Sequence, residues 1–303
     1  MSEKGDLLLQ CEAALSNALL HFSEDADCLA PLPPQERLLA TLKACTEALS
    51  NLTPVPRVSD IIAGYCADLL ECCGTNDGVL LCVVTQFLAD MSLQEDNVDL
   101  FLRFGLPSEY LLILQRWQSL TTNTLNCVFD FVSTICTSSA ASRQSLRPCI
   151  PYVLAAMHHN LYAIEVLFGA AVTLSTLTTL DNDNCKLVAQ RGGVQILISA
   201  FYHAYRTQST VVQVEQKKSL QSSCALIARA QTHRLGEKEQ LCQDVQKWCR
   251  DVLLKVCRSR CEDTTAALQQ ADFGAYGHCL ALDELKWTLM LDVSGIEKRP
   301  VKS

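Results

Sequence analysis

Apolar residues recur along most of the chain at spacings of three and four positions, which places them on one face of an α-helix. In residues 5–23 one side of such a helix carries Leu7, Leu8, Cys11, Leu15, Ala18 and Leu19. Four later segments are apolar over most of their circumference, which is typical of helices packed between neighbours: 79–90, 122–137, 163–179 and 217–230. Residues 237–260 and 280–292 are again amphipathic. We therefore predict an all-α protein.

The pattern repeats with a period of 44 residues. Three sets of positions recur in phase: Arg103, Arg147 and Arg191; Leu106, Ile150 and Val194; Val84, Val128 and Val172. A period of this length is typical of a small helical unit that stacks on copies of itself.

Each predicted unit holds three helices. A short first helix ends at the in-phase arginine, and a Gly or Pro then interrupts the chain. The second helices are expected over 107–118, 151–158 and 194–205, with Pro107 and Pro151 in the first turn, where a missing N–H costs nothing. The long apolar segments are the third helices.

This three-helix unit resembles the armadillo repeat. Residues 184–198 are similar to that family's first helix, glycine turn and second helix. Residues 48–52, Ala-Leu-Ser-Asn-Leu, resemble the end of a third helix, and the segment around Gly64 resembles another turn between first and second helices. The resemblance covers roughly residues 36–230.

The resemblance implies a right-handed, armadillo-like α-solenoid of about five units, forming one elongated domain over residues 1–303. Residues 1–35 are then an N-terminal cap helix with a Pro-rich break, and residues 36–230 are the repeats. Residues 231–296 are C-terminal capping helices, because the last unit of a solenoid needs a polar outer face, and 297–303 are a tail.

The third helices of armadillo proteins line a concave groove. By that resemblance the groove residues here are Asn51, Gln86, Asn126, Asp130, Glu165 and Thr173, and the spacing of Gln86, Asp130 and Thr173 predicts one row. Import receptors of the family bind basic peptides through groove tryptophans and asparagines. The third helices here carry no tryptophan, which argues against that function. The alternative that these side chains are simply solvated stays open.

The in-phase Arg103, Arg147 and Arg191 allow two interpretations. A row of arginines along one edge would bind an acidic peptide. Alternatively, each arginine lies at a helix C-terminus and offsets the helix dipole by about 0.3–1 kcal/mol. We favour the second.

Charge is spread unevenly over the 303 residues. The net charge is −8, yet residues 1–100 hold 16 acidic and 4 basic residues, whereas 204–260 hold 11 basic and 5 acidic ones. An acidic chain is a poor nucleic-acid binder, since phosphate contacts supply most of the non-specific affinity. We therefore expect protein partners. No membrane contact is expected either, because the least charged stretch, 161–180, contains Glu165 and several hydroxyl residues.

The chain has 17 cysteines, and its first residues lack the apolar core of a signal peptide. Reduced thiols in a cytoplasmic compartment are therefore expected, with cysteines in apolar runs, such as Cys82, acting as small hydrophobes. Cys257 and Cys261 flank Arg258 and Arg260, which would favour a reactive thiolate, although core packing is the simpler interpretation. We expect no metal site, because a second pair of ligands is not nearby in the sequence.

No catalytic signature or cofactor motif is present: glycine-rich phosphate loops and the nucleophile-elbow pattern are missing, and the six histidines are scattered. The predicted function is a non-catalytic cytoplasmic scaffold or adaptor that binds a peptide or a helical partner along the groove, without a cofactor. One alternative is a structural component of a cytoskeletal or ciliary assembly. Another is a regulatory subunit or a chaperone nucleotide-exchange factor.

Overall fold

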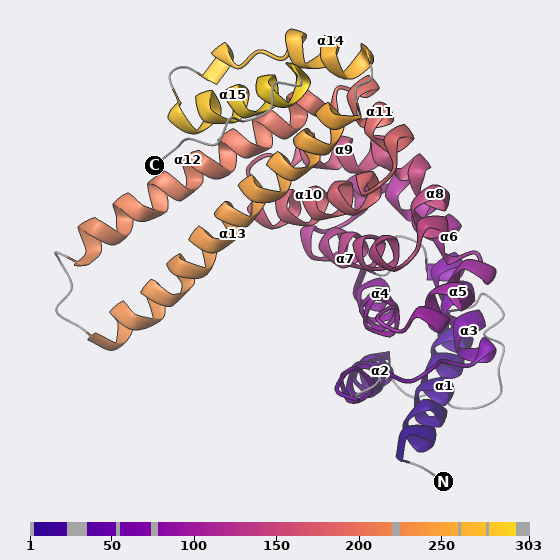
Figure 1. Ribbon diagram of the computed structural model, residues 1–303. Helices are drawn as coiled ribbons and strands as arrows, with labels where there is room; N and C mark the ends of the chain where they lie inside the picture. Colours follow the sequence, from indigo (N-terminus) through magenta and orange to yellow (C-terminus); the bar gives the residue numbers. More distant parts are fainter. Residues whose placement is uncertain are drawn as a thin grey trace. The chain divides into compact units, whose positions relative to one another are not determined.

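The computed structural model describes residues 3–22, 35–52, 55–73, 78–219, 225–259, 262–276 and 279–294. Within these residues the regular structure is entirely helical, with no strand (Figure 1). The chain divides into two compact units, Met1–Tyr152 and Val153–Ser303.

Among the described residues of the first unit, eight α-helices precede its boundary, and a ninth, α9, continues across it. Their bounds are α1 Glu3–Phe22, α2 Gln35–Ser50, α3 Asp60–Cys73, α4 Gly78–Met91, α5 Glu95–Arg103, α6 Leu106–Gln115, α7 Thr122–Ser138, α8 Ala140–Ser145 and α9 Ile150–His159. Two short 3₁₀-helices, Trp117–Ser119 and Arg147–Cys149, follow α6 and α8.

The second unit continues with longer helices. Their bounds are α10 Ile164–Thr178, α11 Asn182–Gln190, α12 Gly193–Ser219, α13 Ala225–Arg258, α14 Glu262–Gln270 and α15 Leu280–Ser294, with a 3₁₀-turn at Gly274–Tyr276.

The predicted first helix and the first three long apolar segments are confirmed. In α1, Cys11, Leu15 and Ala18 are buried, and the helix packs against α2 and α3. Helices α4, α7 and α10 begin and end within about two residues of the predicted limits. The start of α7 is fixed by Thr121, whose hydroxyl accepts a hydrogen bond from the Thr124 N–H at 3.2 Å.

The in-phase valines of these helices are not equivalent. Val84 and Val128 are buried in the first unit, as expected, but Val172 of α10 is partly exposed. The 44-residue period thus fixes which residues correspond, while their burial depends on what packs against each helix.

The glycine turns between first and second helices are confirmed at two positions. Gly105 and Gly192 both have a φ of 72°, a left-handed conformation that glycine adopts without steric cost. At the second turn the next residue must also lack a side chain, because a Cβ on Gly193 would lie 2.6 Å from the Val188 carbonyl oxygen. The double glycine therefore gives both the turn and the close return of the chain.

The turn predicted around Gly64 is wrong. Helix α3 runs without interruption from Asp60 to Cys73, and Gly64 lies inside it, facing the ring of Phe104. The non-helical residues before α3 end at Ser59, whose hydroxyl accepts a hydrogen bond from the Ile62 N–H. The repeat that contains α3 and α4 therefore has its break earlier in the sequence than the glycine suggests.

The helix predicted over 217–230 is also wrong. Lys217 belongs to α12 and Ala230 to α13, which are two long helices packed side by side (Figure 1). No Gly or Pro occurs between Tyr205 and Ser219, so nothing ends α12 at the predicted position. The third helix of this repeat is α13, and it includes the segment predicted separately at 237–260, with Val245, Val252 and Val256 buried.

A polar network joins α10 to α13. Lys255 Nζ lies 2.6 Å from Asp251 Oδ2 and donates hydrogen bonds to the Ser175 carbonyl and hydroxyl and to the Thr179 hydroxyl, at 2.9–3.0 Å. The Ser175 hydroxyl donates in turn to Asp251 Oδ2. These side chains are half-buried, and the polar groups at this junction satisfy one another's hydrogen-bonding capacity.

The C-terminal helix has the predicted position, and its exposed side mixes the charged residues Asp283, Glu284 and Lys286 with apolar ones. Leu282, Leu285 and Leu289 of α15 are buried, whereas Leu280 and Trp287 are 79% and 69% exposed. The sequence of α15 is apolar on more than one side, so packing one side leaves others in solvent.

Candidate functional site

Two neighbouring third helices of the first unit, α4 and α7, place polar side chains on a shared surface. Gln86 and Asp90 are one turn apart on α4, and Asn126 and Asp130 are one turn apart on α7. Gln86 and Asp130 are exposed, and the other two are partly exposed. We call these four residues the polar face.

The members of the polar face interact with one another. Gln86 Nε2 donates a hydrogen bond to Asp90 Oδ1 at 3.1 Å. Partial desolvation and the charge of Asp90 both raise the pKa of Asp130. Two carboxylates that repel each other in this way are stabilised by a cation between them, such as a lysine or arginine side chain.

Asn126 is the least satisfied member. Its Oδ1 atom is inaccessible to solvent and has no hydrogen-bond partner among the described residues. A buried acceptor without a partner costs about 1–3 kcal/mol. A donor supplied to this atom would therefore recover free energy that folding alone leaves unused.

The structure brings together only part of the predicted groove row. Gln86 donates a hydrogen bond to Asp90, and Asp90 lies close enough to Asp130 to raise its pKa. Gln86 and Asp130 therefore lie near each other, as the spacing suggested. Thr173 in the second unit is instead buried, and its hydroxyl donates to the Gly169 carbonyl at 2.8 Å. Its side chain is therefore occupied inside the protein rather than presented to a ligand.

The remaining predicted groove residues belong to other helices than the polar face. Asn51 is exposed just after α2, and its Nδ2 donates to the Glu47 carbonyl at 2.7 Å, which closes the end of that helix. Glu165 is exposed in the first turn of α10 and lies close enough to Cys242 of α13 to raise the pKa of that thiol. A role in binding for either residue stays a prediction.

The three in-phase arginines lie at or near the ends of first helices. Arg103 is the last residue of α5 and forms an exposed ion pair with Asp60 at 3.7 Å. Arg191 follows α11 directly, and Arg147 begins the 3₁₀-turn after α8. These positions agree with the helix-dipole interpretation. Binding of an acidic peptide along them stays a prediction.

A pair of thiols lies one turn from the polar face. Cys82 precedes Gln86 by four residues on α4, and Cys127 adjoins Asn126 on α7. Each thiol shifts the pKa of the other, so the two side chains lie close together between the packed helices α4 and α7. Both are partly exposed, whereas the other cysteines whose burial the structure describes are buried.

Cys82, which the sequence predicts to act as a small hydrophobe, is partly exposed, and its sulfur contacts polar groups. The hydrogen bond from Cys127, with smaller contributions from Thr124 and Asn123, lowers the pKa of Cys82 to about 6 even though burial opposes it. Its partner responds in the opposite sense, since the same hydrogen bond and burial raise the pKa of Cys127. The sequence signal was present but weak: Cys127 is one residue past the position 44 residues after Cys82.

The cysteine pair chosen from sequence does not show these properties. Cys257 is buried at 3% exposure, and burial raises the pKa of Cys249 two turns earlier on α13. Cys261 lies outside the described residues. Neighbouring arginines in the sequence therefore predict the pKa of a thiol less well than the hydrogen-bond donors that contact its sulfur.

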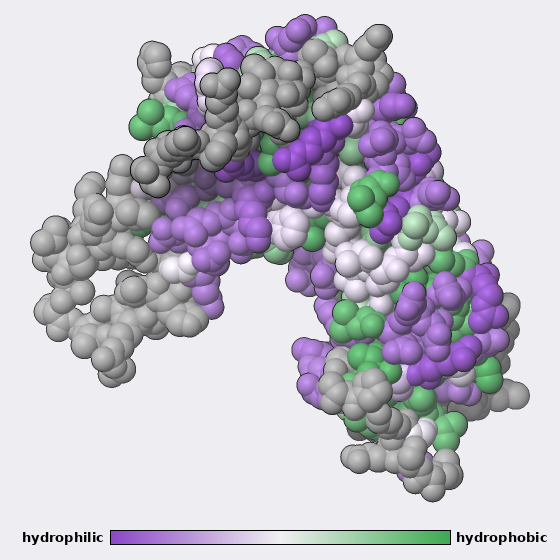
Figure 2. All heavy atoms as spheres, viewed as in Figure 1, coloured by the Kyte–Doolittle hydropathy of each residue, from purple (hydrophilic) through white to green (hydrophobic). Residues whose placement is uncertain are grey.

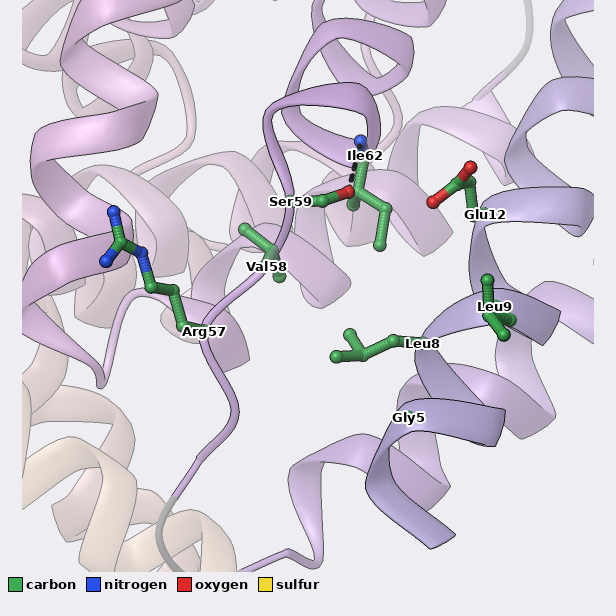
Figure 3. Close-up of a pocket in the computed structure, with 8 residues that line it drawn as sticks. All are labelled: Gly5, Leu8, Leu9, Glu12, Arg57, Val58, Ser59 and Ile62. Carbon is green, nitrogen blue, oxygen red and sulfur yellow. Dashed lines mark hydrogen bonds between the residues drawn. The ribbon is translucent and has the colours of Figure 1, made fainter. Parts of the chain in front are cut away.

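An apolar pocket of about 490 Å³ lies between α1 and the start of α3. Leu8, Val58 and Ile62 point toward one another around it, and Arg57 points away (Figure 3). Hydrophobic residues also show between hydrophilic ones on the surface of this region (Figure 2). The pocket has the size and lining to accept an aliphatic side chain, and the sequence analysis did not identify it.

Two further searches concern the described residues only. They contain no group of three or more His, Cys, Asp or Glu side chains placed to hold a metal ion. In the same part of the chain, every helix is too short or too polar to cross a bilayer.

Neither a protein-family model nor a curated protein sequence matches the chain. Its structure is similar to those of two engineered proteins. One is a designed armadillo repeat protein, with a TM-score of 0.54 and 9% identity over 93% of this chain and 99% of the other. The second is an engineered protein of the Northeast Structural Genomics Consortium, with a TM-score of 0.55 and 11% identity over 93% and 97%. The chain therefore has an armadillo-like repeat fold, an all-α solenoid.

Proposed function

We propose that the protein is a non-catalytic interaction scaffold that binds an extended, basic peptide segment across the polar face of α4 and α7. The observation that carries the proposal is the combination found there. Two carboxylates, Asp90 and Asp130, lie close enough to repel each other, and beside them Asn126 has an acceptor without a partner. A lysine- or arginine-containing peptide supplies the missing positive charge between the two carboxylates.

The amide side chains suit the backbone of such a peptide. An extended peptide has free N–H and C=O groups on both edges, and an Asn or Gln side chain offers one acceptor and two donors. Gln86 is exposed, so its amide can bind main chain while Asp90 and Asp130 bind a side chain. Main-chain contacts of this kind give affinity, and the side-chain contact gives specificity.

The armadillo-like fold supports the proposal because helical repeats present long surfaces suited to extended ligands. The chemistry differs from that of the import receptors, since α4 and α7 carry no tryptophan on which lysine stems would stack. We therefore expect moderate affinity that falls with ionic strength, because exposed charge pairs are screened by salt.

The test is a peptide array that contains matched basic, neutral and acidic sequences, probed with the labelled full chain and followed by titration of the best peptide. Asp130→Arg is expected to weaken binding at least tenfold, because it replaces an attraction with a repulsion. Asp99→Arg is the matched control. Asp99 is an exposed acidic residue of α5, and the same charge change there should alter binding less than twofold.

Equal effects of the two substitutions would show that only net charge matters and would overturn the site. Selection of neutral or acidic peptides would overturn the ligand class. The two alternative functions, structural component and enzyme regulator, involve folded partners. A partner that binds with full affinity to the Asp130→Arg protein would favour one of them over peptide binding.

A further inference from the structure

The thiol pair between α4 and α7 has an arrangement that packing alone does not require. Cys82 Sγ lies 3.4 Å from Thr124 Oγ1 and 3.5 Å from Asn123 Nδ2. These two residues precede Cys127 by three and four positions, so they share its side of α7. Residues from one helix face thus converge on a single sulfur atom of the neighbouring helix.

The same contacts place that sulfur at the first turn of α7, which begins at Thr122. The unpaired N–H groups and the dipole of a helix favour a negative charge at this end. The Asn123 side chain donates to the sulfur, the Thr124 hydroxyl accepts from the thiol, and Cys127 further favours the thiolate. A thiolate on Cys82 is therefore stabilised from several directions, and the pKa of Cys82, about 6, agrees with this geometry.

We propose that Cys82 and Cys127 form a hydroperoxide-reactive dithiol site, in which Cys82 is oxidised first and Cys127 then closes a reversible disulfide between α4 and α7. The proposal is independent of peptide binding. The oxidant is a hydroperoxide, and a small dithiol or a cellular thiol reductant reverses the reaction.

The chemistry occurs in two steps. The Cys82 thiolate attacks the terminal oxygen of the hydroperoxide, the O–O bond breaks, and the departing oxygen takes a proton to leave as water or an alcohol. Cys82 is then a sulfenic acid. The Cys127 sulfur loses its proton and attacks the Cys82 sulfur, the S–O bond breaks, and a second water leaves. In total, two thiols lose two electrons and the hydroperoxide gains them.

The unequal environments of the two thiols assign their roles. Cys82 has donors that favour its thiolate, whereas Cys127 donates to Cys82 and lies near the carboxylate of Asp130. A low-pKa, accessible thiol beside a second thiol is the arrangement that oxidises to a disulfide rather than to irreversible acids. The other cysteines of known burial lack this access.

The first experiment treats the reduced full-length protein with one to two equivalents of hydrogen peroxide, blocks free thiols and maps disulfides by mass spectrometry. The Cys82–Cys127 disulfide is expected as the first product, with two free thiols lost per molecule and recovered by dithiothreitol. A different first disulfide, or oxidation spread over many cysteines, would overturn the proposal.

The second experiment separates the two roles by trapping sulfenic acid with dimedone. Cys127→Ser removes the resolving thiol, so dimedone should accumulate on Cys82. Cys82→Ser should leave Cys127 unlabelled under the same conditions. Melting curves of both variants check that they fold. Equal labelling at the two positions would contradict the assigned order.

The third experiment tests the donors through the pH dependence of alkylation. In the native protein, Cys82 alkylation should be half-maximal near pH 6, and Asn123→Ala should shift that midpoint upward and slow the reaction at pH 6 several-fold. The other titratable groups facing the pair are Asp130 of α7 and Tyr110 of α6. A midpoint at pH 8–9 in the native protein would show an ordinary thiol and would overturn the proposal.

Discussion

The polar side chains of the third helices have different environments in the two units. In the first unit, α4 and α7 leave Gln86 and Asp130 exposed, and the acceptor of Asn126 has no partner among the described residues. In the second unit, α10 and α13 turn theirs toward each other, so that Lys255 and Asp251 are bonded within one network. The third helices therefore leave polar side chains exposed in one unit and pair them with one another in the other unit.

The largest expected effect is a loss of folding stability when a charge is introduced at the in-phase valines of α7 and α10. Val128 is fully buried in α7, whereas its counterpart Val172 in α10 is partly exposed. Val128→Asp places an unpaired charge in the core and should lower the free energy of unfolding by about 4 kcal/mol or more. Val172→Asp should cost clearly less. Denaturant unfolding followed by circular dichroism measures both, and equal losses would refute the difference in burial.

A smaller effect is expected from the network of the second unit. Lys255→Met removes the hydrogen bonds to Ser175 and Thr179 and leaves Asp251 without its cation, which should cost about 1–3 kcal/mol. Lys186→Met is the control, because its ion pair with Asp183 is exposed and 3.8 Å long, and should cost about 0–0.5 kcal/mol. Thermal unfolding of the two variants distinguishes them. Indistinguishable melting curves would mean that the network adds nothing to cohesion.

The smallest expected effect has the opposite sign. The pKa of Asp130 is raised in the folded protein, so the folded state binds a proton more readily than the unfolded state. Its ionisation therefore destabilises the fold above the folded-state pKa, and the penalty disappears as pH falls through that pKa. Asp130→Asn should raise stability at pH 7 by less than about 1 kcal/mol while weakening basic-peptide binding.

The control for this last prediction is Asp99→Asn, which should change neither quantity measurably, because Asp99 is an exposed acidic residue of another helix. A stability loss in the Asp130→Asn protein would show that the carboxylate holds the structure together. The polar face would then be a structural element, like the network of α10 and α13.

Much of the fold could be predicted because local chemistry determines it. The long apolar segments gave α4, α7 and α10 closely, and Gly105 and Gly192 marked turns that require a positive φ. Gly64 misled the prediction because glycine also fits inside a helix, as it does in α3. The length of α12 was not predicted, because its later turns are stabilised by packing against the next helix, α13, which the helical pattern alone does not show.

The candidate site was only partly predictable for a similar reason. The period of 44 residues brings Gln86 and Asp130 to corresponding positions, and in the structure Asp90, one turn after Gln86, lies close enough to Asp130 to raise its pKa. The period does not identify Asp90, which lies between these two residues, or the thiol pair. Those contacts depend on how α4 is rotated against α7. Sequence spacing predicts which residues correspond, whereas the contacts between neighbouring helices decide their chemistry.

The long helices α12 and α13 have matched lengths. Helix α12 has 27 residues against 10 in the corresponding α6, and α13 has 34 against 17 in α7, so each is longer by 17 residues. At 1.5 Å per residue, each gains about 25 Å. Because the two gains are equal and the helices run in opposite directions, the chain returns to the level from which it departed (Figure 1). The extension can therefore be shortened as a unit. Removing the same whole number of turns from α12 and α13 should leave the packing of α14 and α15 unchanged.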